Sequence, residues 1–202
     1  MSDKFTVTQI DLLKEIGTIG SATAATSLAE MVQSRVEITV PQVSLIPIEN
    51  IANIMEGPDR LYFVLDMEIK GDIDGRIFFL LPPDNAKFLG GVLLGKAPAE
   101  VDLNDDLFKS SLREVCNILG GSYVSALANM TSMTIFISIP SLALDMVGAI
   151  LDFIFIQIAQ DAEEALIIRT DMKVKDTNLE GLFLLFPTVD SLKKIFSILN
   201  VT

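Results

Sequence analysis

The sequence predicts a single α/β domain of the α+β kind over residues 1–202, built from two halves related by a pseudo-two-fold axis. Each half is expected to hold a long helix, strands with a hairpin, and shorter helices packed on an antiparallel sheet. The main observation is self-similarity: "DLLKEIGTIG" and "SSLREVCNILGG" place Glu15 and Glu114 in matching positions, 99 residues apart. A fixed period of this kind indicates an internal repeat, which we place at about 8–95 and 103–200.

The first half predicts its elements in a clear order. An apolar pattern of helical period opens it, and Thr8 with Asp11 resembles a capping arrangement. A β-branched run, a short helix, two strands around a glycine-containing turn and a final helix follow. The expected ranges are helix 8–32, strand 36–48, helix 48–55, hairpin 61–81 and helix 84–95.

The second half repeats this order after a linker at 95–105. Here "MTIFISIP" is the β-branched run, and "SLALDMVGAI" is expected to form the short helix. Segment 152–160 fits a helix and a strand equally well. The expected ranges are helix 103–131, strand 133–140, helix 141–151, hairpin 165–186 and helix 188–199.

Composition excludes several classes of function. Half of the 202 residues are apolar, which predicts a sizeable core, and the formal charge of −12 disfavours nucleic acid and anionic membrane surfaces as partners. No basic segment with an apolar run opens the chain, and aspartates interrupt its longest apolar stretch, so we expect no membrane insertion. The single cysteine, Cys116, favours a reducing, cytoplasmic location.

The chain contains no histidine, which excludes Ser-His-Asp hydrolysis and histidine-ligated zinc. No Walker A loop or dinucleotide fingerprint is present either. We therefore expect no cofactor or metal in this chain, and any chemistry must use carboxylates, amides and hydroxyls.

A polar stripe follows the second long helix. At about 100° per residue, Glu114, Asn117 and Gly121 fall within about 40° of Ser110, opposite the apolar face. Two ordinary readings compete with a functional site: a solvated helix surface, and a capping box in which Ser111 caps a helix and Glu114 is its third residue. The first long helix repeats the stripe with a threonine in place of the asparagine, and its members are Asp11, Glu15, Thr18 and Ala22.

These residues resemble the motif of the CheC/CheX/FliY family of chemotaxis phosphatases. The motif is an aspartate or serine, a glutamate four residues later, an asparagine three further on and a proline 23 after that. The second copy has it as Ser110, Glu114, Asn117 and Pro140. The first copy departs from it at one position, and reads Asp11, Glu15, Thr18 and Pro41. Two copies without a further C-terminal domain look most like the CheC branch.

The resemblance implies a substrate and a role for each residue. The substrate is the aspartyl phosphate of the response regulator CheY, which carries the Mg²⁺ itself. Glu114 would pair with a lysine of the regulator, Asn117 would hold the attacking water, and Ser110 and Pro140 would support them. With a short hydroxyl at Thr18, the first site is expected to be weak or inert.

The resemblance also implies a second partner, the receptor deamidase CheD, held through Asp145 on the helix expected at 141–151. Two alternatives to the enzyme remain. One is an adaptor that binds phosphorylated CheY or CheD with vestigial hydrolysis. The other, a structural subunit of the motor, is disfavoured because the sequence shows no switch domain.

Overall fold

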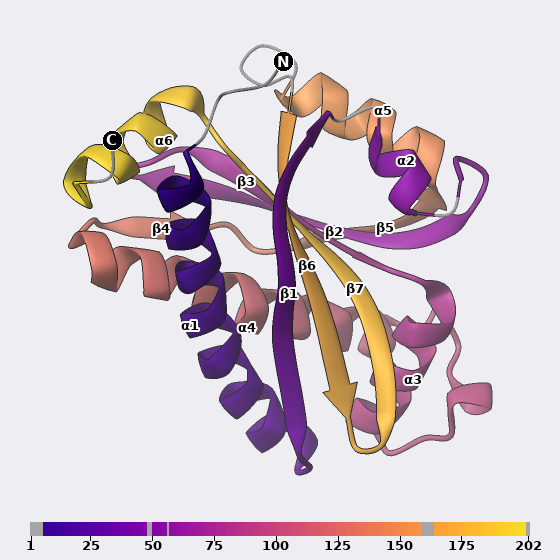
Figure 1. Cartoon of the computed structure of the whole chain (residues 1–202). Coiled ribbons are helices and arrows are strands. Elements are labelled where there is room, and N and C mark those ends of the chain that lie inside the picture. Colours follow the sequence, from indigo (N-terminus) through magenta and orange to yellow (C-terminus); the bar gives the residue numbers. More distant parts are fainter. Residues whose placement is uncertain (1–5, 48–49, 56, 159–163, 201–202) are drawn as a thin grey trace.

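The computed structural model describes residues 6–47, 50–55, 57–158 and 164–200 (Figure 1). Its centre is a seven-stranded sheet in which all the paired strands are antiparallel. Six strands follow one another across it in the order β1 (Val36–Pro47), β6 (Glu164–Val174), β7 (Thr177–Pro187), β3 (Gly75–Leu81), β2 (Leu61–Gly71) and β4 (Ile135–Ile137). The seventh strand, β5 (Ser141–Met146), pairs with the same edge of β2 as β4 does.

This strand order interleaves the two halves of the chain. β1 comes from the first half, but it pairs with β6 of the second half. In the two halves, β1 corresponds to β4, β2 to β6 and β3 to β7. Exchanging these counterparts gives the same strand order in reverse. The predicted fold class is therefore confirmed, while the repeat boundaries at 8–95 and 103–200 stay a prediction.

Helices cover both faces of the sheet and enclose two apolar cores (Figure 1). The larger core lies under α1 (Val7–Val32), α3 (Pro83–Leu94), α4 (Asp106–Thr131) and α6 (Val189–Ile198). The smaller core lies on the other face, under α2 (Ile51–Ile54) and α5 (Val147–Ile158). The long helices α1 and α4 thus belong to one layer, on the same side of the sheet.

α1 and α4 approach each other closely at a glycine. A Cβ on Gly20 would lie 2.9 Å from the Cα of Tyr123, which is nearer than side chains pack. Glycine lets the two backbones meet there, and the Tyr123 ring stacks on Phe183 of the sheet with centroids 4.5 Å apart. The contact fixes the two helices against each other and against the strands beneath them.

The structure corrects both predicted starts of the long helices. α1 is capped by Thr6, whose hydroxyl accepts from the backbone of Gln9 at 3.3 Å while the Gln9 side chain accepts from Thr6. Thr8 and Asp11 lie within the helix, so the capping arrangement predicted for them is wrong. α4 starts at Asp106 rather than at 103, because Asp105 provides its cap.

The segment after Pro140 is the larger correction. The helix expected at 141–151 is strand β5 up to Met146, and α5 then runs from Val147 to Ile158. An apolar run such as "SLALDM" suits either structure, and here the open edge of β2 decides because it offers hydrogen-bond partners along the whole run. The ambiguous segment is helical up to Ile158, and 159 and 160 lie outside the described residues. The strand predicted at 133–140 shrinks to β4.

Candidate functional site on the α4 surface

The cap of α4 decides between the readings of Glu114. The Asp105 carboxylate accepts from the backbone N–H of Leu107 at 3.0 Å, and the helix continues without a break from Asp106. The Ser111 hydroxyl donates to the carbonyl of Phe108 at 2.7 Å, inside the helix, so Ser111 is not an N-cap. The capping-box reading is therefore excluded, and Glu114 lies in the helix interior.

The apolar face of α4 sets the rotation of the helix. Phe108, Leu112, Val115 and Leu119 are fully buried against the sheet, and the Phe108 ring meets the edge of Phe63 at 5.6 Å between centroids. A 26-residue helix held along this face cannot rotate without exposing a large apolar area. Its opposite face is thus held rigidly towards the outside.

The predicted stripe occupies that outer face. Ser110, Glu114 and Asn117 are exposed, and Gly121 is half-buried. Glu114 and Asn117 are three residues apart, which makes them neighbours on the helix surface. Within the described part of the chain, neither the Glu114 carboxylate nor the Asn117 amide hydrogen-bonds to another group, so both are available to a partner.

Cys116 lies between Glu114 and Asn117 in the sequence, but it is not on the exposed polar stripe of α4. Its thiol is fully buried, and desolvation raises its pKa, with a further upward contribution from the Asp66 carboxylate. A thiol with a raised pKa stays protonated and is a poor nucleophile. Cys116 therefore serves the core, and the chemistry of the surface depends on oxygen and amide groups.

The strand that precedes Pro140 packs beside the stripe. A Cβ on Gly121 would lie 3.9 Å from Cδ1 of Ile137 in β4, an ordinary van der Waals distance, so this strand lies against the helix at the end of the stripe. Pro140 itself is buried. Just before it, the Ser138 hydroxyl accepts from the backbone of Glu68 at 2.9 Å, and Ser138 donates its own N–H to Glu68.

The corresponding surface on α1 differs at its key position. Asp11, Glu15 and Thr18 are exposed in one stripe, as predicted. The Thr18 hydroxyl, however, donates to the carbonyl of Lys14 at 2.8 Å and is thus engaged by its own helix. Pro41 lies in β1, and its side chain is outside the described residues.

Asp145 is exposed, but it lies on strand β5 and not on the helix expected at 141–151. It sits on β5 opposite Tyr62, whose ring packs on the core under α2 and α5. Directly opposed residues share a face, so Asp145 is on the other side of the sheet from α4. The structure therefore does not bring it together with Glu114 and Asn117.

Two features were not visible in the sequence. Ile139, next to Pro140, is 87% exposed, and Phe136 is 62% exposed. Both belong to a run that reads as a continuous strand, and only the early end of β4 leaves Ile139 outside the sheet.

Across the described ranges, no group of three His, Cys, Asp or Glu side chains is placed to hold a metal, and no helix is long and apolar enough to cross a bilayer.

The sequence model of the CheC-like family matches residues 9–45 and 109–143. These segments contain both stripes and both prolines, in the arrangement described above. The chain is therefore similar to the CheC-like family over the two segments that carry its motifs. One relative in this family, the CheY-P phosphatase CheC of Bacillus subtilis, is 29% identical over 198 residues, which cover 96% of this chain and 95% of the relative.

Solved structures share this fold. FliY of Thermotoga maritima superimposes with a TM-score of 0.79 over 98% of both chains at 20% identity. A chain of the CheX–CheY–BeF3–Mg complex from Borrelia burgdorferi gives a TM-score of 0.51 at 19% identity, covering 84% of this chain and 96% of the other. At these identities the likeness establishes the architecture alone.

Proposed function

We propose that this CheC-like chain hydrolyses the aspartyl phosphate of a phosphorylated CheY-type response regulator, mainly through the surface of α4. The observation that supports this most strongly is the pair formed by Glu114 and Asn117, exposed and unengaged on a helix whose rotation the core fixes. A carboxylate and a carboxamide held one turn apart suit a partner that presents a lysine beside a phosphoryl group.

The chemistry demands little of this chain beyond positioning. The water oxygen bonds to phosphorus as the bond between phosphorus and the aspartyl oxygen breaks, which yields inorganic phosphate and a free aspartate. An acyl phosphate is already activated, so a water held in line is sufficient. The Asn117 amide can accept a hydrogen bond from that water and donate another to it or to the phosphoryl oxygens, without adding negative charge.

The other groups hold the partner in place. Glu114 would pair with the regulator's lysine, and Mg²⁺ bound by the regulator would neutralise the phosphoryl oxygens. Ser110 and Pro140 would shape the helix surface and the strand beside it. The proposal places this reaction in the cytoplasm, where a buried, reduced thiol such as Cys116 persists.

Turnover separates this enzyme from a non-enzymatic adaptor. The test follows loss of the regulator's aspartyl phosphate with the chain present at a small fraction of the regulator's concentration. An enzyme releases many phosphates per chain, whereas an adaptor binds the phosphorylated regulator and leaves its spontaneous decay rate unchanged.

Restoring the amide on α1 should add activity. We expect Thr18→Asn to raise turnover by up to about twofold, because a second surface equal to that of α4 would act independently. Thr18→Ala should leave the rate unchanged, since the hydroxyl is bonded to Lys14. The measurement is the steady-state release of phosphate, and a Thr18→Ala variant at half the wild-type rate would refute the assignment of activity to α4.

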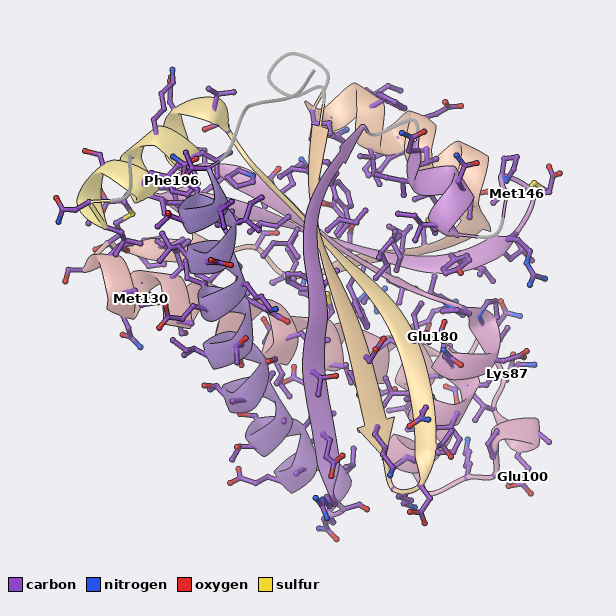
Figure 2. The ribbon with its side chains drawn as sticks, in the orientation of Figure 1. Lys87, Glu100, Met130, Met146, Glu180 and Phe196 are labelled. Atoms are coloured by element: carbon purple, nitrogen blue, oxygen red, sulfur yellow. The ribbon has the colours of Figure 1, made fainter. Side chains whose placement is uncertain are left out.

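We further propose that the deamidase CheD binds at β5, on the edge that carries Asp145. The strand found there changes the surface expected from the sequence, because Val147 and Ile150 are buried and cannot meet a partner. Leu144 and Met146 remain partly exposed, at 40% and 51%, and Figure 2 shows Met146 at the outer rim of the molecule. An exposed strand edge with apolar neighbours and a carboxylate is a suitable protein-binding surface.

Reversal of the charge at Asp145 should separate the two partners. Asp145→Lys is expected to weaken CheD binding by about tenfold or more, because a cation would replace the carboxylate in the proposed interface, and to leave phosphate release within about twofold of wild type. The matched control is Asp152→Lys, which makes the same change at an exposed aspartate on α5. Equal CheD affinity for Asp145→Lys and wild type, measured by titration calorimetry, would place CheD elsewhere.

A further inference from the structure

The chain returns along α4 after the helix ends. Ile137 lies against Gly120 and Gly121, since a Cβ on either glycine would be within 3.9 Å of its Cδ1. Seven residues later, Leu144 lies opposite Phe63, whose ring contacts Phe108 near the start of the helix. The stretch between Ile137 and Leu144 therefore runs beside α4 in the opposite direction.

This geometry brings Ile139 level with the proposed site. An extended chain advances about 3.3 Å per residue and a helix about 1.5 Å, so two residues of strand match about four residues of helix. Ile137 lies against Gly121. Ile139, two residues after Ile137, is therefore level with Asn117, four residues before Gly121. The polar pair on the helix thus has an aliphatic neighbour on the adjoining segment.

Ile139 is held in a projecting position. On one side of it, Ser138 makes two hydrogen bonds with the backbone of Glu68, each of 2.9 Å. On the other side, Pro140 is buried and β5 begins. Ile139 itself is 87% exposed, the largest exposed fraction among the large apolar side chains of the described residues. A fixed backbone carrying an exposed aliphatic group pays little entropy on binding.

We infer that Ile139 is a docking residue, which packs on an apolar surface of the response regulator beside its phosphorylated aspartate and helps to select the regulator. The inference rests on the proposed function, because the regulator that presents its lysine to Glu114 must also cover the segment next to Asn117. Lysine and phosphate recognition alone suit any regulator of this chemistry. An apolar contact beside them adds affinity only where the partner's surface is complementary, which is a basis for selection.

Phe136 offers a matched control on the same segment. Side chains alternate along a strand, so Phe136 points away from the face on which Ile135 and Ile137 meet α4. It is also exposed, at 62%, so its loss likewise removes a large exposed apolar side chain. A general effect of lost apolar surface would therefore weaken binding in both variants.

The experiment compares wild type with Ile139→Ser, Ile139→Met and Phe136→Ser. Binding is measured by calorimetry against the regulator as its beryllofluoride adduct with Mg²⁺, and hydrolysis is measured with the phosphorylated regulator. We expect Ile139→Ser to raise Kd and KM by about tenfold, with kcat within about twofold of wild type. Ile139→Met and Phe136→Ser should keep wild-type affinity within about twofold.

The outcomes distinguish this inference from the proposed function. Wild-type affinity in Ile139→Ser, together with loss of hydrolysis in Asn117→Ala, would overturn the docking role and leave the enzyme intact. Equal weakening by Ile139→Ser and Phe136→Ser would also overturn it. Wild-type hydrolysis in Asn117→Ala would remove the proposed function, and the role of Ile139 with it.

Discussion

Asn117→Ala should lower the rate of regulator dephosphorylation by about a hundredfold, the usual effect of losing a group that positions a reactant or stabilises the transition state. The amide is exposed on the outer face of α4 and hydrogen-bonds to nothing else in the described part of the chain. Its removal would leave no group of this chain to position the attacking water. The effect is measured as the single-turnover decay of the phosphorylated regulator at a saturating concentration of this protein. Under that condition a change in affinity does not alter the observed rate.

Stability serves as the internal control for this variant. An exposed helical position tolerates alanine, so the free energy of unfolding should stay within about 0.5 kcal/mol of wild type. Asn129 is an exposed amide about three turns further along the same helix. Asn129→Ala should change neither the dephosphorylation rate nor the free energy of unfolding. A large loss of stability in Asn117→Ala would show that the amide is structural, and a wild-type rate would show that it takes no part in hydrolysis.

Glu114→Lys should raise KM by about tenfold or more, because a lysine of the regulator would then face a like charge where it now meets a carboxylate. Glu15→Lys is the matched control: it makes the same change at the corresponding position of α1, where Thr18 replaces the amide. We expect that variant to retain most of the wild-type kcat/KM. The measurement is the dependence of the initial rate on regulator concentration, at two salt concentrations.

The comparison also tests which half of the chain carries the activity. A larger loss in Glu15→Lys than in Glu114→Lys would move the principal site to α1, despite its threonine. Equal losses would indicate that the two surfaces act together, as a regulator clamped between both helices would require.

The sequence predicted the features that depend on helical phase. Over 26 residues the apolar face of α4 repeats without interruption, so the side on which Glu114 and Asn117 lie follows from the pattern alone. The starts of the long helices were less predictable, since one or two capping side chains decide each of them. Thr6 with Gln9 and Asp105 provide the caps, whereas Thr8 has an equally suitable chemistry but lies inside the helix.

The segment around Pro140 depends on tertiary pairing and was therefore mispredicted. Residues 141–146 are apolar enough for a buried helix or a strand, and the free edge of β2 determines the outcome. That pairing also moves Asp145 to the face opposite α4 and leaves Ile139 outside the sheet. None of these positions can be inferred before the partner strand is known.

The most direct test of the account is the structure of this chain bound to the beryllofluoride adduct of its regulator. The account predicts that α4 lies over the regulator's active site, with the Asn117 amide within hydrogen-bond distance of the fluoride atoms or of a water in line with them, and Glu114 paired with a lysine. A complex in which the regulator sits on another surface, or in which Asn117 points away from the phosphoryl mimic, would contradict it.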